Sequence, residues 1–124
     1  MKLPVTILYV DDEPTNLMLF ELMFKKSFDV VLAESGFQGL EILEKKQDIK
    51  ITISDMKMPG MNGIQFIQKA KQQYPNVFFY ILTSFEITPE INDSMRNGLI
   101  EKFFQKPFNM QEIKSSICEK LAIR

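Results

Sequence analysis

The sequence predicts an α/β protein in which five parallel β-strands form a doubly wound sheet between five helices. Short apolar or β-branched runs alternate with longer segments that carry apolar residues at three- and four-residue spacing. No internal repeat, low-complexity segment or linker interrupts this alternation. Strands joined through helices run parallel by right-handed crossovers, which gives a doubly wound sheet. Helical periodicity alone does not choose among such folds, and we expect the strand order 2-1-3-4-5 with active groups at the carboxyl ends of the strands.

The predicted strands cover residues 5–10, 28–33, 51–54, 77–82 and 102–105. The first, VTILYV, is almost continuously apolar, as expected for a strand that helices cover on both faces. The third, ITIS, is more polar than is usual for such a strand because it contains Thr52 and Ser54. A turn marked by Pro59-Gly60 follows it.

Local signals predict where the helices begin and end. Pro14 suits the first turn of a helix that runs to about residue 26, and Thr88-Pro89 begins a fourth helix that Gly98 ends. Capping boxes predict the other three starts, at Ser35–Gln38, Asn62–Gln65 and Asn109–Glu112. In the first two helices we expect these apolar side chains to face inward: Leu17, Phe20 and Phe24, then Phe37, Leu40 and Leu43.

Composition narrows the class of protein. The chain has 124 residues, 45% of them hydrophobic and 25% charged, so we expect one globular domain over residues 1–124. A net charge of −1 gives no general attraction to nucleic acid or to an anionic membrane. The absence of a signal sequence or a membrane-spanning run, together with a single cysteine, Cys118, predicts a cytoplasmic protein.

The chain contains no histidine. This excludes Ser-His-Asp and Cys-His catalysis, zinc ligation by histidine, and a role as a phosphohistidine carrier.

Five polar residues follow the predicted strands directly: Asp11, Asp12, Asp55, Thr83 and Lys106. In a parallel sheet all of them project toward one patch, although Asp12 taken alone also fits a helix cap. Carboxylates in one patch repel each other, at roughly 4 kcal/mol for two charges about 4 Å apart at an effective dielectric near 20. Such a cluster takes up a proton or recruits a cation.

The chemistry of these side chains suits magnesium and a phosphoryl group. Few oxygen ligands, partly open to solvent, favour a Mg²⁺ ion that keeps waters and bridges to phosphate. The Lys106 ammonium and the Thr83 hydroxyl are suited to the remaining phosphoryl oxygens. A metal-neutralised aspartate can then attack phosphorus and form an aspartyl phosphate.

The same residues resemble the receiver domain of two-component response regulators, of the chemotaxis-regulator type. The matching motifs are Asp11-Asp12, the run DMKMPGMNG from Asp55, Thr83-Ser84 and Lys106-Pro107, each after a predicted strand and in the family's order. The resemblance covers essentially the whole chain and implies a flavodoxin-like fold.

The resemblance implies the roles of the acidic residues. Asp55 would be the phosphoacceptor. Asp11 and Asp12 would bind Mg²⁺ together with the Asp55 carboxylate and the backbone carbonyl of Lys57, with Mn²⁺ as an alternative ion.

It also implies a switch. Thr83 and Lys106 would contact oxygens of the phosphoryl group, and the Lys106-Pro107 peptide bond would be cis. Phe103 matches an aromatic position that turns inward when the Thr83 loop closes on phosphate. That movement would reshape the surface of the fourth helix, fifth strand and fifth helix, where a homodimer is a further family expectation.

The expected function is a signalling switch that promotes its own phosphorylation and dephosphorylation. The phosphodonor would be a sensor histidine kinase or a histidine phosphotransfer protein, and the output would go to another protein, with no direct nucleic-acid or membrane partner. We expect no effector domain within residues 1–124.

Two other functions stay open. One is a phosphohydrolase of the haloacid-dehalogenase type, although that family needs a second Asp where Lys57 stands. The other is a pseudo-receiver that binds partners without phosphorylation. If the chain is a phosphorylated receiver, Lys57 and Phe85 flank the path of the attacking water, and the bulk of Phe85 predicts slow self-dephosphorylation.

Overall fold

The computed structural model describes residues 2–84 and 87–123. Its elements, in chain order, are β1 (Thr6–Val10), α1 (Pro14–Phe24), β2 (Asp29–Ala33), α2 (Gly36–Lys45), β3 (Ile51–Asp55), α3 (Gly63–Gln73), β4 (Phe78–Thr83), α4 (Pro89–Arg96), β5 (Lys102–Gln105) and α5 (Met110–Lys120). Each predicted strand is found, with ends that differ by at most one residue. Among the described residues no helix has the length and apolar character needed to cross a membrane.

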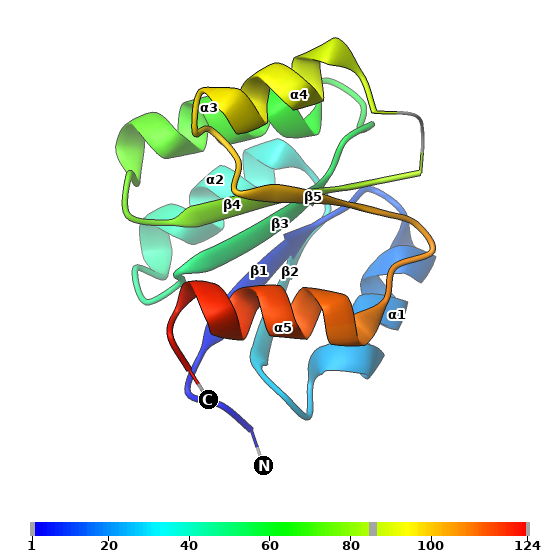
Figure 1. The fold of residues 1–124 in the computed structure, drawn as a ribbon, viewed down its shortest axis with the longest axis vertical. Helices are drawn as coiled ribbons and strands as arrows, with labels where there is room; N and C mark the ends of the chain where they lie inside the picture. The colour runs from blue at the N-terminus through cyan, green and yellow to red at the C-terminus, as the bar shows by residue number, and fades with distance from the viewer. Residues whose placement is uncertain (1, 85–86, 124) are drawn as a thin grey trace.

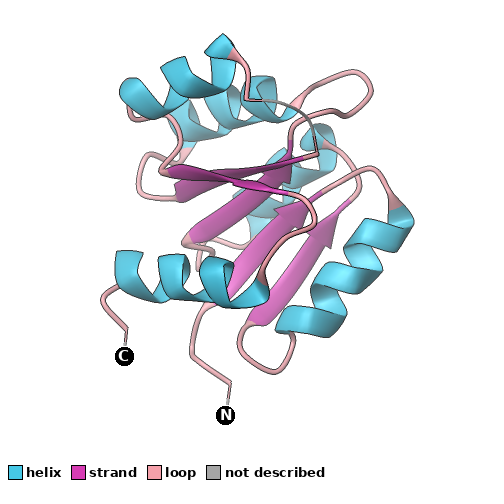
Figure 2. Ribbon diagram, turned by 45° about the vertical axis from the view of Figure 1, so that its right-hand side comes forward, coloured by secondary structure: helices cyan, strands magenta, loops and turns pink. Residues whose placement is uncertain are grey.

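The five strands form one parallel sheet in the order β2-β1-β3-β4-β5, which confirms the predicted topology. Helices α2, α3 and α4 cover one face of the sheet, and α1 and α5 cover the other (Figure 1). Figure 2 shows the strands lying side by side between these two helix layers. The carboxyl ends of all strands therefore meet at one edge.

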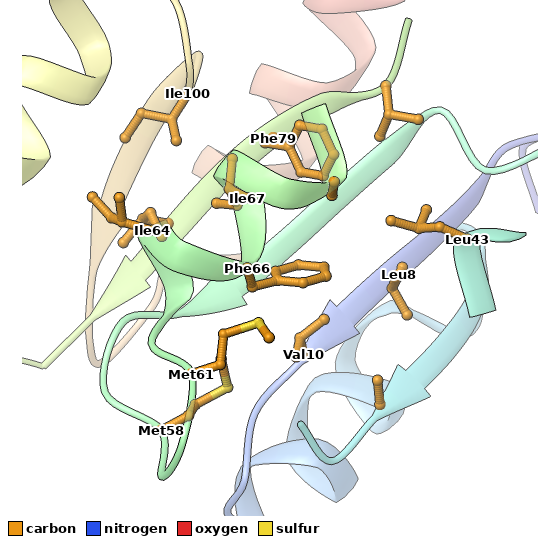
Figure 3. Packing of buried hydrophobic residues seen from close by; sticks show 14 of the residues in the cluster. Leu8, Val10, Leu43, Met58, Met61, Ile64, Phe66, Ile67, Phe79 and Ile100 are labelled. Atoms are coloured by element: carbon orange, nitrogen blue, oxygen red, sulfur yellow. The ribbon is translucent and has the colours of Figure 1, made fainter. Parts of the chain in front are cut away.

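Two apolar cores fill the space between the sheet and the helices. On the α1/α5 face the core is rich in buried aromatic rings: Tyr9, Phe20, Phe24, Phe28, Tyr80 and Phe104. On the other face, aliphatic and methionine side chains surround Phe66 and Phe79, whose rings meet edge to face (Figure 3). Because both faces are covered, β1 and β3 are buried almost along their whole length.

The predicted inner face of α2 was wrong in one residue, because the side chain of Phe37 is 56% exposed. The buried residues of this helix are instead Gly36, Gly39 and Leu43. A Cβ on Gly39 would lie 2.9 Å from the Phe66 ring. Helices α2 and α3 are therefore too close together for a large side chain on this face of α2. The glycines therefore take the inner face, and the ring of Phe37 lies over Gly60.

The predicted capping residues accept backbone hydrogen bonds at the starts of α2, α3 and α5. At α3 the capping box is complete, because Asn62 and Gln65 each bond the other's backbone N–H. At α2 the box is shifted: the Gln38 side chain accepts from the backbone N–H of Glu34 instead of the capping residue.

Candidate phosphoacceptor and metal site

Three carboxylates meet at the carboxyl edge of the sheet. One oxygen each from Asp11, Asp12 and Asp55 lies within 4.8 Å of the others. The register explains this convergence, because Val10 pairs with Ser54 and the next residues of the two neighbouring strands are Asp11 and Asp55. Both of these are buried, whereas Asp12 is more exposed. The cap of α1 is Glu13, so Asp12 does not serve as the helix cap that its position also allowed.

Lys106 brings a positive charge between two of these acids. Its Nζ lies 3.2 Å from Asp11 Oδ2 and 3.2 Å from Asp55 Oδ1, and its side chain is 15% exposed. The backbone N–H of Lys106 donates to the carbonyl of Thr83 at 2.8 Å, which fixes the start of the loop after β5. The following Lys106-Pro107 peptide bond is cis, as the resemblance implied. Residues from three strand ends thus contribute to one cluster of charges.

The cluster carries more negative than positive charge, and this excess affects the pKa of Asp55. Burial, together with the neighbouring Asp11 charge, raises the pKa of Asp55 to about 6, although the Lys106 ammonium acts in the opposite direction. A carboxyl with this pKa is ionised at neutral pH but binds a proton in mild acid. A divalent cation would supply the missing positive charge, and the all-oxygen donor set fits Mg²⁺.

Both oxygens of Asp11 are hydrogen-bonded inside the protein. The Tyr9 hydroxyl donates to Oδ2 at 2.5 Å, and the backbone N–H of Glu13 donates to Oδ1 at 3.0 Å. Burial and the contact with Asp11 raise the pKa of Tyr9 far above its usual value, so the phenol keeps its proton. Sequence analysis missed Tyr9, although residues two apart on a strand share a face and this spacing was readable.

Gly63 is a second residue that sequence analysis missed. A Cβ at this position would stand 2.3 Å from the backbone oxygen of Asp55 and 2.9 Å from Ile81. The backbone N–H of Gly63 donates to the carbonyl of Met56 at 2.8 Å. The start of α3 therefore packs directly on the backbone of the candidate phosphoacceptor. Only structure reveals this requirement, because the glycine has an ordinary position in a helix.

The other predicted site residues occupy the expected edge, and their roles stay predictions. Thr83 is buried at the end of β4, one residue past Leu82, which pairs with Asp55. Lys57 is exposed in the loop after β3. Phe85, which was expected to slow dephosphorylation, lies outside the described residues.

The two neighbouring phenylalanines of β5 point to opposite faces of the sheet, as the alternation of a strand requires. Phe104 is buried in the core beneath α5. Phe103 is half-buried and packs against the core on the α2, α3 and α4 face of the sheet. The expected switch residue therefore lies on the same face of the sheet as α4.

The sequence model of the response regulator receiver domain matches residues 7–118. The chain belongs to this family. Sporulation initiation phosphotransferase F of Bacillus subtilis is 30% identical over 119 residues, which are 95% of this chain and 94% of that protein. A cyclic di-GMP phosphodiesterase of Thermotoga maritima is 26% identical over 97% of this chain, but the match spans only 32% of that protein. Receiver domains thus occur both nearly alone and as parts of longer proteins.

Solved receiver domains share the fold of this chain. The signal receiver domain of an HD domain-containing protein from Pseudomonas fluorescens superposes with a TM-score of 0.88, at 23% identity over 97% of this chain and 96% of that one. Receiver domains of response regulators are signalling switches that interact with histidine kinases or phosphotransfer proteins, and they generally bind Mg²⁺ through an acidic pocket. The Asp11, Asp12 and Asp55 cluster of this receiver domain has the composition of such a pocket.

Proposed function

We propose that residues 1–124 form a single receiver domain in which Asp55 accepts a phosphoryl group in a Mg²⁺-dependent reaction. The donor is a phosphohistidine on a sensor histidine kinase or on a histidine phosphotransfer protein. The observation that carries this proposal is the position of Lys106 Nζ, 3.2 Å from both Asp11 and Asp55. An oxygen of the third acid, Asp12, lies within 4.8 Å of oxygens of these two. A nucleophilic carboxylate, further oxygen ligands and a cation thus share one small site.

In the transfer step, an Asp55 carboxylate oxygen forms a bond to phosphorus as the P–N bond of the donor breaks. The electron pair of that bond stays on the imidazole nitrogen, which takes up a proton. Lys106 pairs with one phosphoryl oxygen, and the Thr83 hydroxyl donates a hydrogen bond to another. Both contacts stabilise the negative charge on these oxygens during transfer. These residues act by position and charge.

The carboxylates of Asp11, Asp12 and Asp55, with the backbone carbonyl of Lys57, would hold Mg²⁺, or Mn²⁺ as an alternative. When bound, this ion neutralises negative charge on the carboxylates and on the incoming phosphoryl oxygens. The protein supports this assignment because burial and the Asp11 charge raise the pKa of Asp55 to about 6, so a nearby positive charge would favour the ionised carboxylate.

Phosphorylation adds negative charge where Lys106 now bridges two acids, so it changes the balance of contacts at the edge of the sheet. We propose that Thr83 and Phe103 respond together and alter the surface of α4, β5 and α5, which a downstream protein or a second copy then binds. This assigns the domain the role of a cytoplasmic switch and not of an enzyme with its own substrate.

Beryllofluoride, a mimic of the phosphoryl group, tests the proposal. Calorimetry should show that wild type binds it only when Mg²⁺ is present, and that Asp55→Asn does not bind it. Failure of folded wild type to bind would favour a pseudo-receiver. Sustained turnover of p-nitrophenyl phosphate would instead favour the phosphohydrolase alternative, and we expect none.

A further inference from the structure

The phenol of Tyr9 lies beneath the acidic cluster and reaches it through one hydrogen bond. It donates to Asp11 Oδ2 at 2.5 Å, which is within the range of strong bonds between a hydroxyl and a carboxylate. We propose that Tyr9 is a positioning residue of the cation site, which holds the Asp11 carboxylate in the orientation that Mg²⁺ requires. This inference rests on the proposed function, because it assumes that Asp11 takes part in cation binding.

The ring of Tyr9 is held rigidly enough to position another group. It is fully buried and stacks on Phe20 with a centroid distance of 4.1 Å and an interplanar angle of 9°. The centroid of the Phe20 ring also lies 4.5 Å from that of Phe24 and 5.9 Å from that of Phe108. The hydroxyl therefore projects from a packed aromatic cluster of β1, α1 and the loop before α5.

The same aromatic cluster supports the loop that carries Lys106. Phe108 follows Lys106 by two residues and packs against both Phe20 and Phe24. The Tyr9 hydroxyl at 2.5 Å and the Lys106 ammonium at 3.2 Å, two donors to Asp11 Oδ2, are thus attached to one packed unit. The aromatic core thus supports both donors, Tyr9 directly and Lys106 through Phe108.

The count of hydrogen bonds indicates what this arrangement does to Asp11. A carboxylate offers about four lone-pair directions. Glu13 N–H occupies one on Oδ1, while Tyr9 and Lys106 occupy both on Oδ2. Among the contacts made by residues 2–84 and 87–123, one direction on Oδ1 therefore stays open for a cation or its bound water. Tyr9 and Glu13 together prevent the carboxylate from rotating away from that direction.

Tyr9 becomes the main side-chain partner that holds Asp11 when Lys106 pairs with another group. In the proposed reaction Lys106 pairs with a phosphoryl oxygen, which weakens its contact with Asp11. Tyr9 has no such alternative, because its ring is enclosed by the aromatic cluster. It therefore keeps Asp11 in place through the reaction. Partners that orient a metal ligand in this way typically change metal affinity by about 10–100-fold when they are removed.

The variant Tyr9→Phe removes one hydroxyl and adds no volume, and Tyr80→Phe is its matched control. Tyr80 is also buried and stacked on a phenylalanine, Phe104, but its side chain lines a surface hollow that none of the three acids lines. Calorimetry should show about tenfold weaker Mg²⁺ binding for Tyr9→Phe. Binding to Tyr80→Phe should equal that of wild type, and circular dichroism verifies that both variants are folded.

Phosphorylation by acetyl phosphate separates positioning from a general structural effect. For Tyr9→Phe we expect the Mg²⁺ concentration at half-maximal rate to rise about tenfold, in step with the affinity. The rate at saturating Mg²⁺ should stay close to that of wild type. A lower saturating rate with unchanged Mg²⁺ dependence would overturn the inference, and so would Mg²⁺ affinity equal to or higher than that of wild type.

A second measurement keeps Tyr9 intact and is independent of how Tyr9→Phe folds. The chain has three tyrosines and no tryptophan, so Tyr74→Phe/Tyr80→Phe leaves Tyr9 as the only strong fluorophore. Mg²⁺ should change the fluorescence of this variant with the same midpoint as its calorimetric binding. A signal that Mg²⁺ does not alter would contradict the inference. If wild type itself bound no Mg²⁺, the proposed function would fail instead.

Discussion

Gly63 packs against the backbone carbonyl of Asp55 so closely that a Cβ on Gly63 would stand 2.3 Å from that oxygen. This contact joins the start of α3 to the end of β3, the strand that presents the candidate phosphoacceptor. Because Gly63 has no side chain, α3 can pack directly on the backbone of Asp55, and this contact helps to set the position of the Asp55 carboxylate.

The variant Gly63→Ala should disturb both the fold and the site. Since the added methyl meets backbone on one side and Ile81 on the other, we expect the free energy of unfolding to fall by about 2–3 kcal/mol. The displaced Asp55 backbone should also weaken Mg²⁺ binding. Urea unfolding and calorimetry measure the two effects.

Gly98→Ala is the comparison for this prediction. Gly98 has a φ of +79°, and a Cβ added to it would meet no described atom within 4 Å. Alanine there adds backbone strain of about 1–2 kcal/mol without a steric contact. Its Mg²⁺ affinity should stay that of wild type. Equal effects of both variants on Mg²⁺ affinity would contradict the role given to Gly63.

Asp55→Asn should stabilise the metal-free protein at neutral pH. Folding raises the pKa of Asp55 from 3.8 to about 6, so the folded protein binds a proton at Asp55 more tightly than the unfolded chain does. This contribution to the free energy of unfolding is complete below about pH 3.8 and is lost as the pH rises through about 6. Asparagine carries no charge at any of these pH values. The difference in unfolding free energy between variant and wild type should therefore grow across this window.

Partial solvent screening of the site keeps the expected gain for Asp55→Asn to about 1–2 kcal/mol above pH about 7. Urea unfolding from pH about 3.5 to 8, without divalent cations, gives the curve. A difference that stays constant with pH would show that burial and Asp11 do not disfavour the ionised carboxylate.

The affinity for Mg²⁺ should depend on pH through the same carboxyl. Because Asp55 must lose its proton before it can bind a cation, affinity should be nearly constant above pH about 7. It should fall by up to about tenfold for each pH unit well below the pKa of about 6. Calorimetry across this range provides the test, and an affinity that rises in acid would be incompatible with it.

Thr52→Val should stabilise the protein. Thr52 is buried in β3 between Leu8 and Phe79, and its Oγ1 has no hydrogen-bond partner within residues 2–84 and 87–123. Valine replaces this unpaired hydroxyl with a methyl group of similar size, so we expect a gain of about 1 kcal/mol in urea unfolding.

Ser54→Ala serves as the control for Thr52→Val. The Ser54 hydroxyl, two residues further on the same strand, donates to the backbone oxygen of Asp55 at 2.9 Å. Its removal should therefore lower stability by about 1 kcal/mol. Changes of the same sign in both variants would rule out this account of the two hydroxyls.

The sequence was sufficient to predict the sheet because each strand has its own apolar run and each helix its own start signal. The meeting of Asp11, Asp55 and Lys106 follows from the rule that parallel strands share a carboxyl edge. Helical periodicity alone does not choose the order β2-β1-β3-β4-β5 among doubly wound folds, and the structure confirms the order that we expected.

The features that could not be predicted depend on close packing between distant segments. Phe37 fits an inward helical stripe, but the approach of Phe66 on α3 makes glycine the better inner residue. Gly63 became visible in the same way, through its close approach to Asp55. The spacing of Tyr9 and Asp11 was readable, but the hydrogen bond between them required coordinates. Packing at the level of single atoms decides these positions.

The central claim is that Asp55 captures a phosphoryl group at the cation site formed with Asp11 and Asp12. The most direct measurement is mass spectrometry of wild type and Asp55→Asn after incubation with acetyl phosphate, with and without Mg²⁺. We predict that wild type gains one phosphoryl group only with Mg²⁺, located on Asp55 by fragmentation, and that Asp55→Asn gains none. An unmodified wild type, or a phosphoryl group carried on another residue, would contradict the claim.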